Sequence, residues 1–304
     1  MSDRTLSTLP TTTQTRREDA TEAFLSRYDG ATRSMYAVDL RIFFDWCASV
    51  RLDPMEARRT DLEAFTRHLI DERGNAVSST RRRLQTVRGF YTLAHADELI
   101  PRNPSVMMRV PRLQRDPGRL VWLDRFQLGS LIRVASEATP AHHALVALMA
   151  MLGLRVSAAC RARIEDVTVD SSGGRHLRVL EKNSRIHTTR VPGEVWEILQ
   201  AAIGDRTEGP IVLRRNGTEQ DRAGAYRWIR ALAQKAGLPQ NIHPHSLRRS
   251  IIAILLDAGE RAEDVQRFAG HADIRTTLGT YHPEGGAKGV HSSFVAVAAL
   301  TNVA

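Results

Sequence analysis

The sequence predicts a mainly α-helical protein of two domains, the second of which also carries short strands. Three observations lead to this prediction. The length of 304 residues suits two hydrophobic cores. Apolar residues recur at helical spacing through most of the chain. That pattern is interrupted by a stretch rich in proline and arginine near residue 110, and by short alternating segments between residues 167 and 191.

The first domain, residues 18–105, is predicted to be a bundle of four helices joined by short links. Helical patterns cover residues 18–28, 32–50, 60–73 and 79–96. Thr60 and Glu63 fit a capping box at the start of the third helix, and Gly74 is expected to end it. In the fourth helix the inward positions are Leu84, Val87, Tyr91 and Ala94.

Segments without helical periodicity mark the limits of the domains. Residues 1–17 are rich in Thr and Ser, which predicts a disordered leader. Four prolines and five arginines lie between residues 101 and 119, which predicts a basic, extended linker over residues 106–119. The second domain is then expected to occupy residues 120–304.

The second domain combines helices with three short strands. Helices are predicted at residues 124–135, 141–152, 193–202, 223–236, 246–258 and 261–268, and strands at 167–169, 176–180 and 188–191. Turn residues at 171–174 and 183–185 separate the strands. The last segment, 282–304, contains a short apolar helix at 294–300, which needs a surface on which to dock because so short a helix is unstable alone.

The charge of the chain favours a polyanionic partner. The net charge is +9 and the isoelectric point is about 10.3. Residues 1–117 hold 19 basic against 16 acidic residues, and residues 118–304 hold 24 against 18, so both domains are basic. We expect six arginines of the fourth helix and the linker to contact DNA, although a solvated basic face would show the same pattern: Arg81, Arg82, Arg83, Arg88, Arg112 and Arg115.

The sequence does not support a disulfide-bonded, secreted or membrane-spanning protein. Cys47 and Cys160 lie in apolar helical contexts and predict reduced core thiols. An apolar leader is missing, and the longest apolar run, residues 144–154, is too short to cross a bilayer, so we expect a cytoplasmic protein without a membrane partner.

No metal or nucleotide cofactor is expected. The pairs His142-His143 and His243-Pro244-His245 lack the cysteine or carboxylate spacing of a zinc site. The chain also has no glycine-rich loop of the kind that holds ATP phosphates.

Six residues in the second domain form an ordered set suited to phosphodiester chemistry: Arg155, Lys182, His245, Arg248, His271 and Tyr281. Two guanidinium groups can hold a phosphate through paired hydrogen bonds. A phenol attacks phosphorus once a base or a dense positive charge removes its proton. A lysine or histidine can protonate the leaving oxygen. The set therefore predicts cleavage of a phosphodiester without a metal.

Each of these residues also has a plain structural alternative. Arg155 alone would fit a salt bridge, Lys182 a solvated turn and Tyr281 a core position. The order of the whole set, and the scarcity of lysine (3 against 40 arginines), favour the functional interpretation.

The ordered set, with Gly153-Leu154-Arg155, His245-Ser246-Leu247-Arg248 and Gly270-His271 ten residues before Tyr281, resembles the tyrosine recombinase (phage integrase, Xer-like) family from about residue 18 onward. The resemblance implies a SAM-like helical core-binding domain and a mostly helical catalytic domain with a small antiparallel sheet. The two domains would close as a clamp on double-stranded DNA at a specific recombination site. It also implies a homotetramer on DNA, exchange of the C-terminal tail between subunits, and an accessory DNA-bending or directionality factor.

The resemblance further implies a role for each catalytic residue. Tyr281 would form a 3′-phosphotyrosine, and Arg155 and Arg248 would stabilise the phosphorus. Lys182 would protonate the leaving oxygen, while His245 and His271 would assist proton transfer. Many relatives carry an acidic residue where this chain has Ala158, and Glu165 or Asp166 are the candidates to replace it.

The function predicted within the family is integration of phage or mobile-element DNA. Only about 17 residues precede the first domain, as in simple integrases and Xer-like resolvases. The alternatives are an Xer-like resolvase of chromosomes or plasmids, a catalytically impaired DNA-binding protein on the same scaffold, and a metal-dependent nuclease or transposase.

Overall fold

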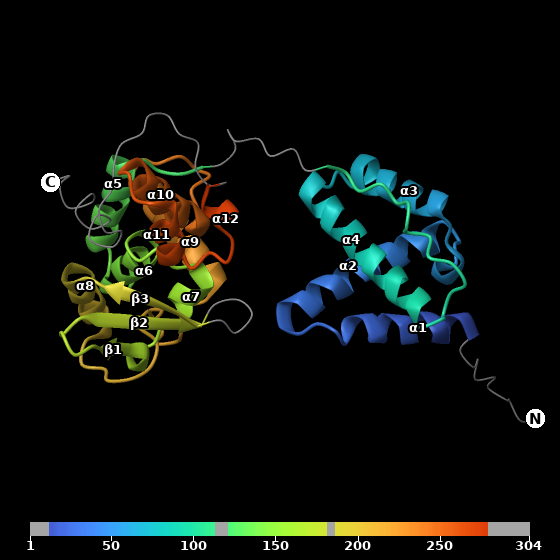
Figure 1. Cartoon of the computed structure of the whole chain (residues 1–304). Helices are drawn as coiled ribbons and strands as arrows, with labels where there is room; N and C mark the ends of the chain where they lie inside the picture. The colour runs from blue at the N-terminus through green and yellow to red at the C-terminus, as the bar shows by residue number, and fades with distance from the viewer. Residues whose placement is uncertain (1–11, 113–120, 181–185, 279–304) are drawn as a thin grey trace, which may run out of the picture. The chain divides into compact units, whose positions relative to one another are not determined.

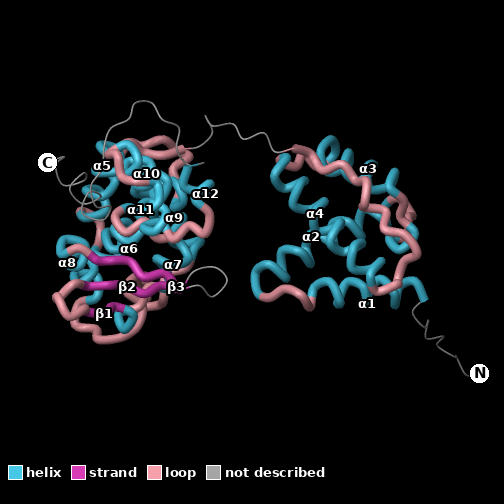
Figure 2. Tube along the Cα trace, in the orientation of Figure 1, coloured by secondary structure: helices cyan, strands magenta, loops and turns pink. Residues whose placement is uncertain are grey.

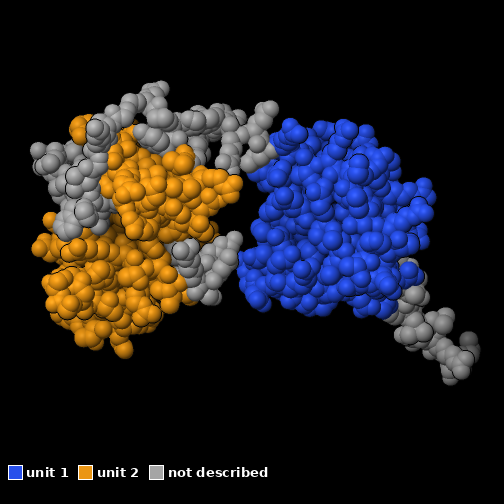
Figure 3. All heavy atoms as spheres, in the orientation of Figure 1, with its two compact units in different colours: residues 1–115 blue, residues 116–304 orange. Residues whose placement is uncertain are grey.

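The computed structural model describes residues 12–112, 121–180 and 186–278 (Figure 1). The chain divides into two compact units, residues 1–115 and 116–304 (Figure 3). The division falls inside the predicted linker of residues 106–119. Each unit has its own hydrophobic core.

In its described part the first unit consists of helices joined by loops, without a strand (Figure 2). It contains α1 (Thr12–Leu25), α2 (Gly30–Ser49), α3 (Arg59–Arg67) and α4 (Val77–Ala96), with a 3₁₀ turn at Pro54–Glu56 and a π-helical turn, His68–Glu72, that continues α3. Four helices were expected, and four are present. Helix α1 begins at Thr12, however, so residues 12–17 are not part of a disordered leader.

The start of α3 also differs from the prediction. The helix begins at Arg59, and the carboxylate of Asp61 accepts the backbone N–H of Arg58 at 2.7 Å. Thr60 and Glu63 therefore lie inside the helix instead of forming its capping box. Asp61 satisfies a donor that has no partner within the helix, which is the role expected of Glu63, two positions earlier in the chain.

Aromatic rings fill the core of the first unit. The ring of Phe43 lies 4.9 Å from that of Phe65 and 5.9 Å from that of Tyr91, centroid to centroid. The predicted inward residues of α4 are all buried: Leu84, Val87, Tyr91 and Ala94. Gly89 allows α1 to approach α4, because a Cβ at this position would lie 2.8 Å from the ring of Phe24.

The second unit surrounds the buried helix α6 (Pro140–Ala150), in which residues 144–150 are all buried. The other helices are α5 (Arg125–Ser136), α7 (Val156–Arg161), α8 (Gly193–Ile203), α9 (Arg222–Lys235), α10 (Pro244–Asp257), α11 (Ala262–Ala269) and α12 (Ile274–Leu278). Six of these eight helices were predicted from periodicity. Helices α7 and α12 have only six and five residues, too few to show a period in the sequence.

The three strands form the predicted antiparallel sheet, in the order β1-β2-β3. Strand β1 (Val167–Val169) pairs with β2 (Arg175–Leu180), and β2 pairs with β3 (Ile186–Val191). Leu177, Val179 and Val191 point into the core. Leu180 pairs with Ile186 at the end of the hairpin where β2 and β3 are connected. Lys182 belongs to the connection beyond that end, which lies outside the described residues.

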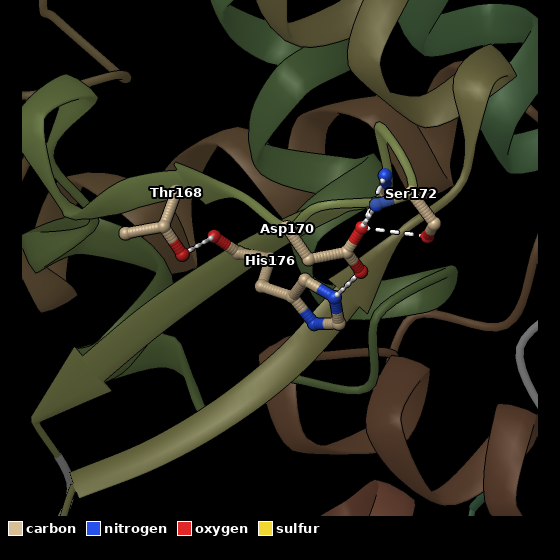
Figure 4. A network of polar contacts seen from close by, with 5 residues as sticks. Thr168, Asp170, Ser172 and His176 are labelled. Atoms are coloured by element: carbon tan, nitrogen blue, oxygen red, sulfur yellow. Dashed lines mark hydrogen bonds and ion pairs between the residues drawn. The ribbon is translucent and has the colours of Figure 1, made fainter.

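The turn between β1 and β2 is organised by Asp170 (Figure 4). Its Oδ1 accepts the N–H and hydroxyl of Ser172 at 2.8 and 2.6 Å, and its Oδ2 contacts Nε2 of His176 at 2.9 Å. The hydroxyl of Ser172 and the other hydrogen bonds hold the pKa of Asp170 well below its usual range. Serine and histidine both bond to the carboxylate, so this Asp-Ser-His group is a turn brace and not a nucleophile activated by a base.

The structure also bears on the predictions made for the two cysteines and for membrane-spanning segments. Cys47 and Cys160 are free and buried, as predicted, and burial raises the pKa of their thiols to about 12 and about 11. Within the described ranges, none of the helices combines the length and apolarity that crossing a membrane requires.

Candidate active site

Arg248 occupies the centre of the candidate site. It lies in the second turn of α10, and 2% of its surface is exposed. Its Nη1 donates to the carbonyl of Gly153, which follows α6, and its Nη2 donates to the carbonyl of Ala269, the last residue of α11. One guanidinium thus joins two loops that lie 95 and 21 residues away in sequence. These loops lead directly to Arg155 and His271.

Arg155 lies two residues beyond the carbonyl that Arg248 binds. It is the N-cap residue of α7, with an extended backbone (φ −66°, ψ 147°), and its side chain is half-buried. Gly153 makes this turn feasible because its φ is +64° and because a Cβ there would lie 2.6 Å from the ring of Phe268 on α11. The turn that carries Arg155 is therefore packed directly against the element that leads to His271.

His271 follows α11 after a glycine. Gly270 ends the helix in the left-handed conformation, with φ +59° and ψ +36°. The His271 side chain is buried, and its Nδ1 lies 2.8 Å from the hydroxyl of Thr277 on α12. The amide of Gln266 donates to the His271 carbonyl at 3.0 Å. Because Thr277 engages Nδ1, Nε2 is the ring nitrogen that can exchange a proton with a substrate.

The two histidines are neutral bases in a positive field. The pKa of His271 is lowered to about 4 by burial and then by the charges of Arg248, Arg155 and His245. The pKa of His245 is lowered to about 4 by burial, then by Arg249, Arg248 and other cations. The His245 side chain is nevertheless exposed to solvent.

These shared electrostatic effects place four of the six predicted catalytic residues together: Arg155, His245, Arg248 and His271. The charged groups that shift the two histidines within the described residues are all cationic. Such a cluster attracts an anion, and it also favours the ionised form of any phenol brought beside it. Tyr281 and Lys182 lie outside the described residues, as does the tail of residues 282–304.

A hollow leads to His271 from the sheet side. Its lining comes from β3, from α11 and from the turn that follows α11: His187, Thr188, Glu263, Gln266, Arg267, Gly270 and His271. The end of the hairpin where β2 and β3 are connected therefore lies beside the same hollow as the buried histidine. A substrate that enters the hollow meets His271 on one side and strand β3 on the other.

The lowered pKa of His271 predicts a pH dependence of stability. Its pKa in the folded protein lies below the ordinary value of 6.5, so the unfolded chain binds the proton more readily as the pH falls from 6.5 towards 4. The free energy of unfolding should therefore decrease as the pH falls through this window. We expect His271→Gln to reduce that decrease in urea unfolding measured between pH 6.5 and 5.

The exposed His95 provides the control for this measurement. His95→Gln should leave the slope of stability against pH close to that of the unmodified protein. A His271→Gln variant with an unchanged slope would show that the burial of His271 does not exclude its protonated form.

Some residues of the site were missed or misjudged from the sequence. Thr277 and Gln266 position His271, and Thr277 lies within the motif that drew attention to His271 and Tyr281. Glu165 does not replace the acidic residue missing at Ala158. Its Oε1 binds Arg163 at 2.6 Å and its Oε2 accepts the N–H of Gly209 at 2.9 Å, so it braces a loop.

The histidine pairs considered as metal ligands have other contacts. The ring of His142 stacks on that of Trp228 at 4.0 Å, and His243 and His245 lie with nearly parallel rings. No cluster of three or more potential ligands occurs within residues 12–112, 121–180 and 186–278. The independence from metal remains a prediction.

The arginines predicted to contact DNA have varied surroundings. Arg82 and Arg83 form ion pairs with Asp39 of α2, whose side chain is fully buried. Arg81 and Arg88 donate to the carbonyls of Pro111 and Met108, which hold the segment after α4 against the helix. Arg112 is exposed, and Arg115 lies outside the described residues. Much of this basic cluster therefore has a structural role, and DNA contact by its exposed parts remains a proposal.

The Asp39 ion pairs predict a large effect on stability. Asp39→Asn removes the negative charge and leaves Arg83, whose side chain is 14% exposed, without its counter-ion. We expect a loss of roughly 3 kcal/mol in the free energy of unfolding, because breaking a buried pair leaves an uncompensated charge. Urea unfolding of the full chain, followed by tryptophan fluorescence, measures this loss.

The matched control is the pair between Arg59 and Glu63, which is exposed on both sides. Glu63→Gln should cost less than about 1 kcal/mol, because solvent screens such a pair. Equal losses in the two variants would mean that burial does not strengthen the contribution of Asp39.

Comparisons with known proteins identify the family of this chain. The sequence model of the phage integrase family matches residues 121–284. The chain is similar to tyrosine recombinase XerC of Xylella fastidiosa (strain M23), with 30% identity over 253 residues, 81% of this chain and 84% of that protein. It is also similar to tyrosine recombinase XerD of Bifidobacterium longum (strain NCC 2705), with 24% identity over 268 residues, 81% and 85% of the two chains.

Solved structures share the fold. A lambda integrase dimer bound to a COC′ core site matches with a TM-score of 0.70 and 16% identity, over 86% of this chain and 96% of that one. XerH bound to a palindromic difH substrate matches with a TM-score of 0.68 and 15% identity, over 83% and 76%. With the family model covering more than half of the sequence, the chain belongs to the phage integrase family of tyrosine-type site-specific recombinases.

Proposed function

We propose that this recombinase cuts and rejoins double-stranded DNA at a specific site through a 3′-phosphotyrosine formed by Tyr281. The observation that carries the proposal is the cluster of Arg155 and buried Arg248 around two neutral histidines. Such a site holds a phosphodiester by charge and still offers a base for proton transfer. DNA as the partner is supported by the net charge of +9 and by relatives whose structures contain recombination sites.

In the proposed first step the oxygen of Tyr281 attacks the scissile phosphorus. The bond from phosphorus to the 5′ oxygen breaks, and that oxygen leaves as a hydroxyl after it takes a proton from Lys182. Arg155 and Arg248 stabilise the charge on the phosphoryl oxygens, and His271, assisted by His245, takes the proton of the phenol. The phosphotyrosine conserves the energy of the broken bond, so neither ATP nor metal is required.

The second step reverses the first on a different strand. The 5′ hydroxyl of a partner strand attacks the phosphorus of the phosphotyrosine, and Lys182 accepts its proton. The bond from phosphorus to the tyrosine oxygen breaks, and His271 returns a proton to that oxygen, so that Tyr281 is released as a phenol. Two DNA sites with two strands each require four active tyrosines, which supports a homotetramer on DNA. The apolar tail of residues 282–304 is the segment that we propose to link neighbouring subunits.

The role of Lys182 can be tested without knowledge of its position. We expect Lys182→Ala to cleave normal DNA slowly, and to recover most of its rate on DNA whose 5′ bridging oxygen is replaced by sulfur. A thiolate leaves without protonation, so the general acid is not needed for that substrate. Lys235→Ala, which removes one of the two other lysines, is the control.

Equal losses of rate on the oxygen and sulfur substrates would exclude Lys182 as the general acid. It would then act as a DNA contact or as a support for the site.

Within the family we propose integration of phage or mobile-element DNA, which takes place in the cytoplasm, with an accessory factor that sets direction. The alternative is an Xer-like resolvase of chromosome or plasmid multimers, and the similarity to XerC and XerD favours it. The two roles use the same chemistry and differ in how the DNA sites are arranged.

A recombination assay separates these roles. Plasmids that carry the DNA flanking the gene are mixed with the protein in EDTA, without nucleotide. Joining of two different plasmids supports integration, whereas conversion of plasmid dimers to monomers by two sites in one molecule supports the resolvase. Recombination that stops in EDTA would contradict the metal-independent mechanism.

A further inference from the structure

Three rings form a row beside the catalytic arginines. Tyr226 lies on α9, His243 is the N-cap residue of α10, and His245 lies in the first turn of α10. The rings of Tyr226 and His243 are 5.9 Å apart with planes at 19°, and those of His243 and His245 are 6.5 Å apart with planes at 6°. Helices α9 and α10 pack together, and this packing aligns the three rings in nearly parallel planes.

Both ends of this row are exposed. Tyr226 leaves 40% of its surface in solvent, and His245 is exposed as well, while His243 is partly buried between them. Aromatic residues contribute most to folding when their rings are covered, so the exposed end of Tyr226 contributes little to the core. The row is a surface feature attached to the catalytic site.

The charge around the row suits nucleic acid. The pKa of His243 is lowered by burial and by Arg249, and the same arginine contributes to the lowered pKa of His245. Near pH 7 the two imidazoles are therefore neutral π-systems, and the positive charge is held by the arginines beside them. This combination of flat rings and neighbouring cations is the one that single-stranded nucleic acid uses, with bases on the rings and phosphates on the cations.

We propose that Tyr226, His243 and His245 form a stacking platform for an unpaired DNA base next to the cleaved phosphate. The proposal rests on the proposed strand exchange, in which nucleotides beside the cut leave one complementary strand and pair with another. In a duplex the faces of each base are covered by its neighbours, so only a nucleotide that has left the stack can lie on these rings. The platform would hold that nucleotide between cleavage and rejoining.

Fluorescence of 2-aminopurine tests this proposal directly. The probe is a short duplex with a central bubble of unpaired nucleotides, one of them 2-aminopurine, and it is compared with the same duplex fully paired. We expect the full-length protein to bind the bubble more tightly and to quench its fluorescence by stacking. Tyr226→Ala should weaken binding to the bubble by roughly 5- to 150-fold, the effect of losing one stacked base, and should weaken binding to the paired duplex much less.

Two variants control for other effects. Tyr226→Phe keeps the ring and should retain the preference for the bubble. Phe126→Ala removes an exposed aromatic side chain from α5 and should leave both affinities unchanged. Equal losses on both probes, or no loss in Tyr226→Ala, would overturn the platform.

Failure of the proposed recombination has a different signature. A preference for the bubble that depends on Tyr226, in a protein that forms no covalent adduct, would leave the platform intact and contradict the phosphotyrosine mechanism. An adduct that depends on Tyr281, without any preference for the bubble, would support the phosphotyrosine mechanism and contradict the platform.

Discussion

The Tyr281→Phe variant is expected to form no covalent adduct with DNA and to retain nearly all its DNA affinity. The ring remains, and only the oxygen that attacks phosphorus is removed. The rate of cleavage should fall on the order of a million-fold, as it does when other enzymes lose their nucleophile. Denaturing gels of the protein with radiolabelled DNA measure the adduct, and gel shifts under native conditions measure affinity.

The matched control is Tyr28→Phe, which changes a tyrosine of the helical unit that packs on Phe24 and Tyr36. It should form the adduct at the normal rate. A 3′-phosphotyrosine that persists in Tyr281→Phe would rule out Tyr281 as the nucleophile. Loss of the adduct together with loss of DNA binding would point instead to a structural role for the phenol.

The Arg248→Lys variant is expected to lose both cleavage and stability. A lysine keeps the charge, but its single ammonium cannot take the place of a fork that reaches the carbonyls of Gly153 and Ala269 together. At least one buried carbonyl then lacks its donor, which costs roughly 1–3 kcal/mol of unfolding free energy. Urea unfolding measures the stability, and single-turnover cleavage of suicide DNA substrates measures the chemistry.

Arg155→Lys provides the comparison for Arg248→Lys. Arg155 is half-buried and lies on one of the two loops that Arg248 joins, so its replacement should slow cleavage with a smaller loss of stability. If Arg248→Lys unfolds at the same urea concentration as the unmodified protein, the two carbonyl contacts do not hold the loops together. The cleavage defect would then reflect only the phosphate contact.

The predictions for Tyr281 and Arg248 differ in how far they depend on the structure. The prediction for Tyr281 follows from the order of residues in the sequence and from the chemistry of a phenol. The prediction for Arg248 required its burial and its two carbonyl partners. In the sequence, His245-Ser246-Leu247-Arg248 indicated only that a histidine and an arginine share one face of a helix.

Several features of the chain were determined by the sequence alone. The periods of its apolar residues predicted four helices in the first unit, and six helices and three short strands in the second, because amphipathic spacing is a local property. The order of Arg155, Lys182, His245, Arg248, His271 and Tyr281 indicated the reaction, because each side chain carries its chemistry with it. Helices of five or six residues, α7 and α12, are too short to show a period.

Only the tertiary structure decided which partner each side chain takes. Arg82 and Arg83 pair with Asp39, more than 40 residues earlier, and are not simply a basic face. Arg248 binds the carbonyl of Gly153, which lies 95 residues earlier, and Tyr226 aligns with His243. The physical reason is that a charged or polar group takes whichever partner folding brings within about 3 Å, and that distance depends on the packing of whole helices.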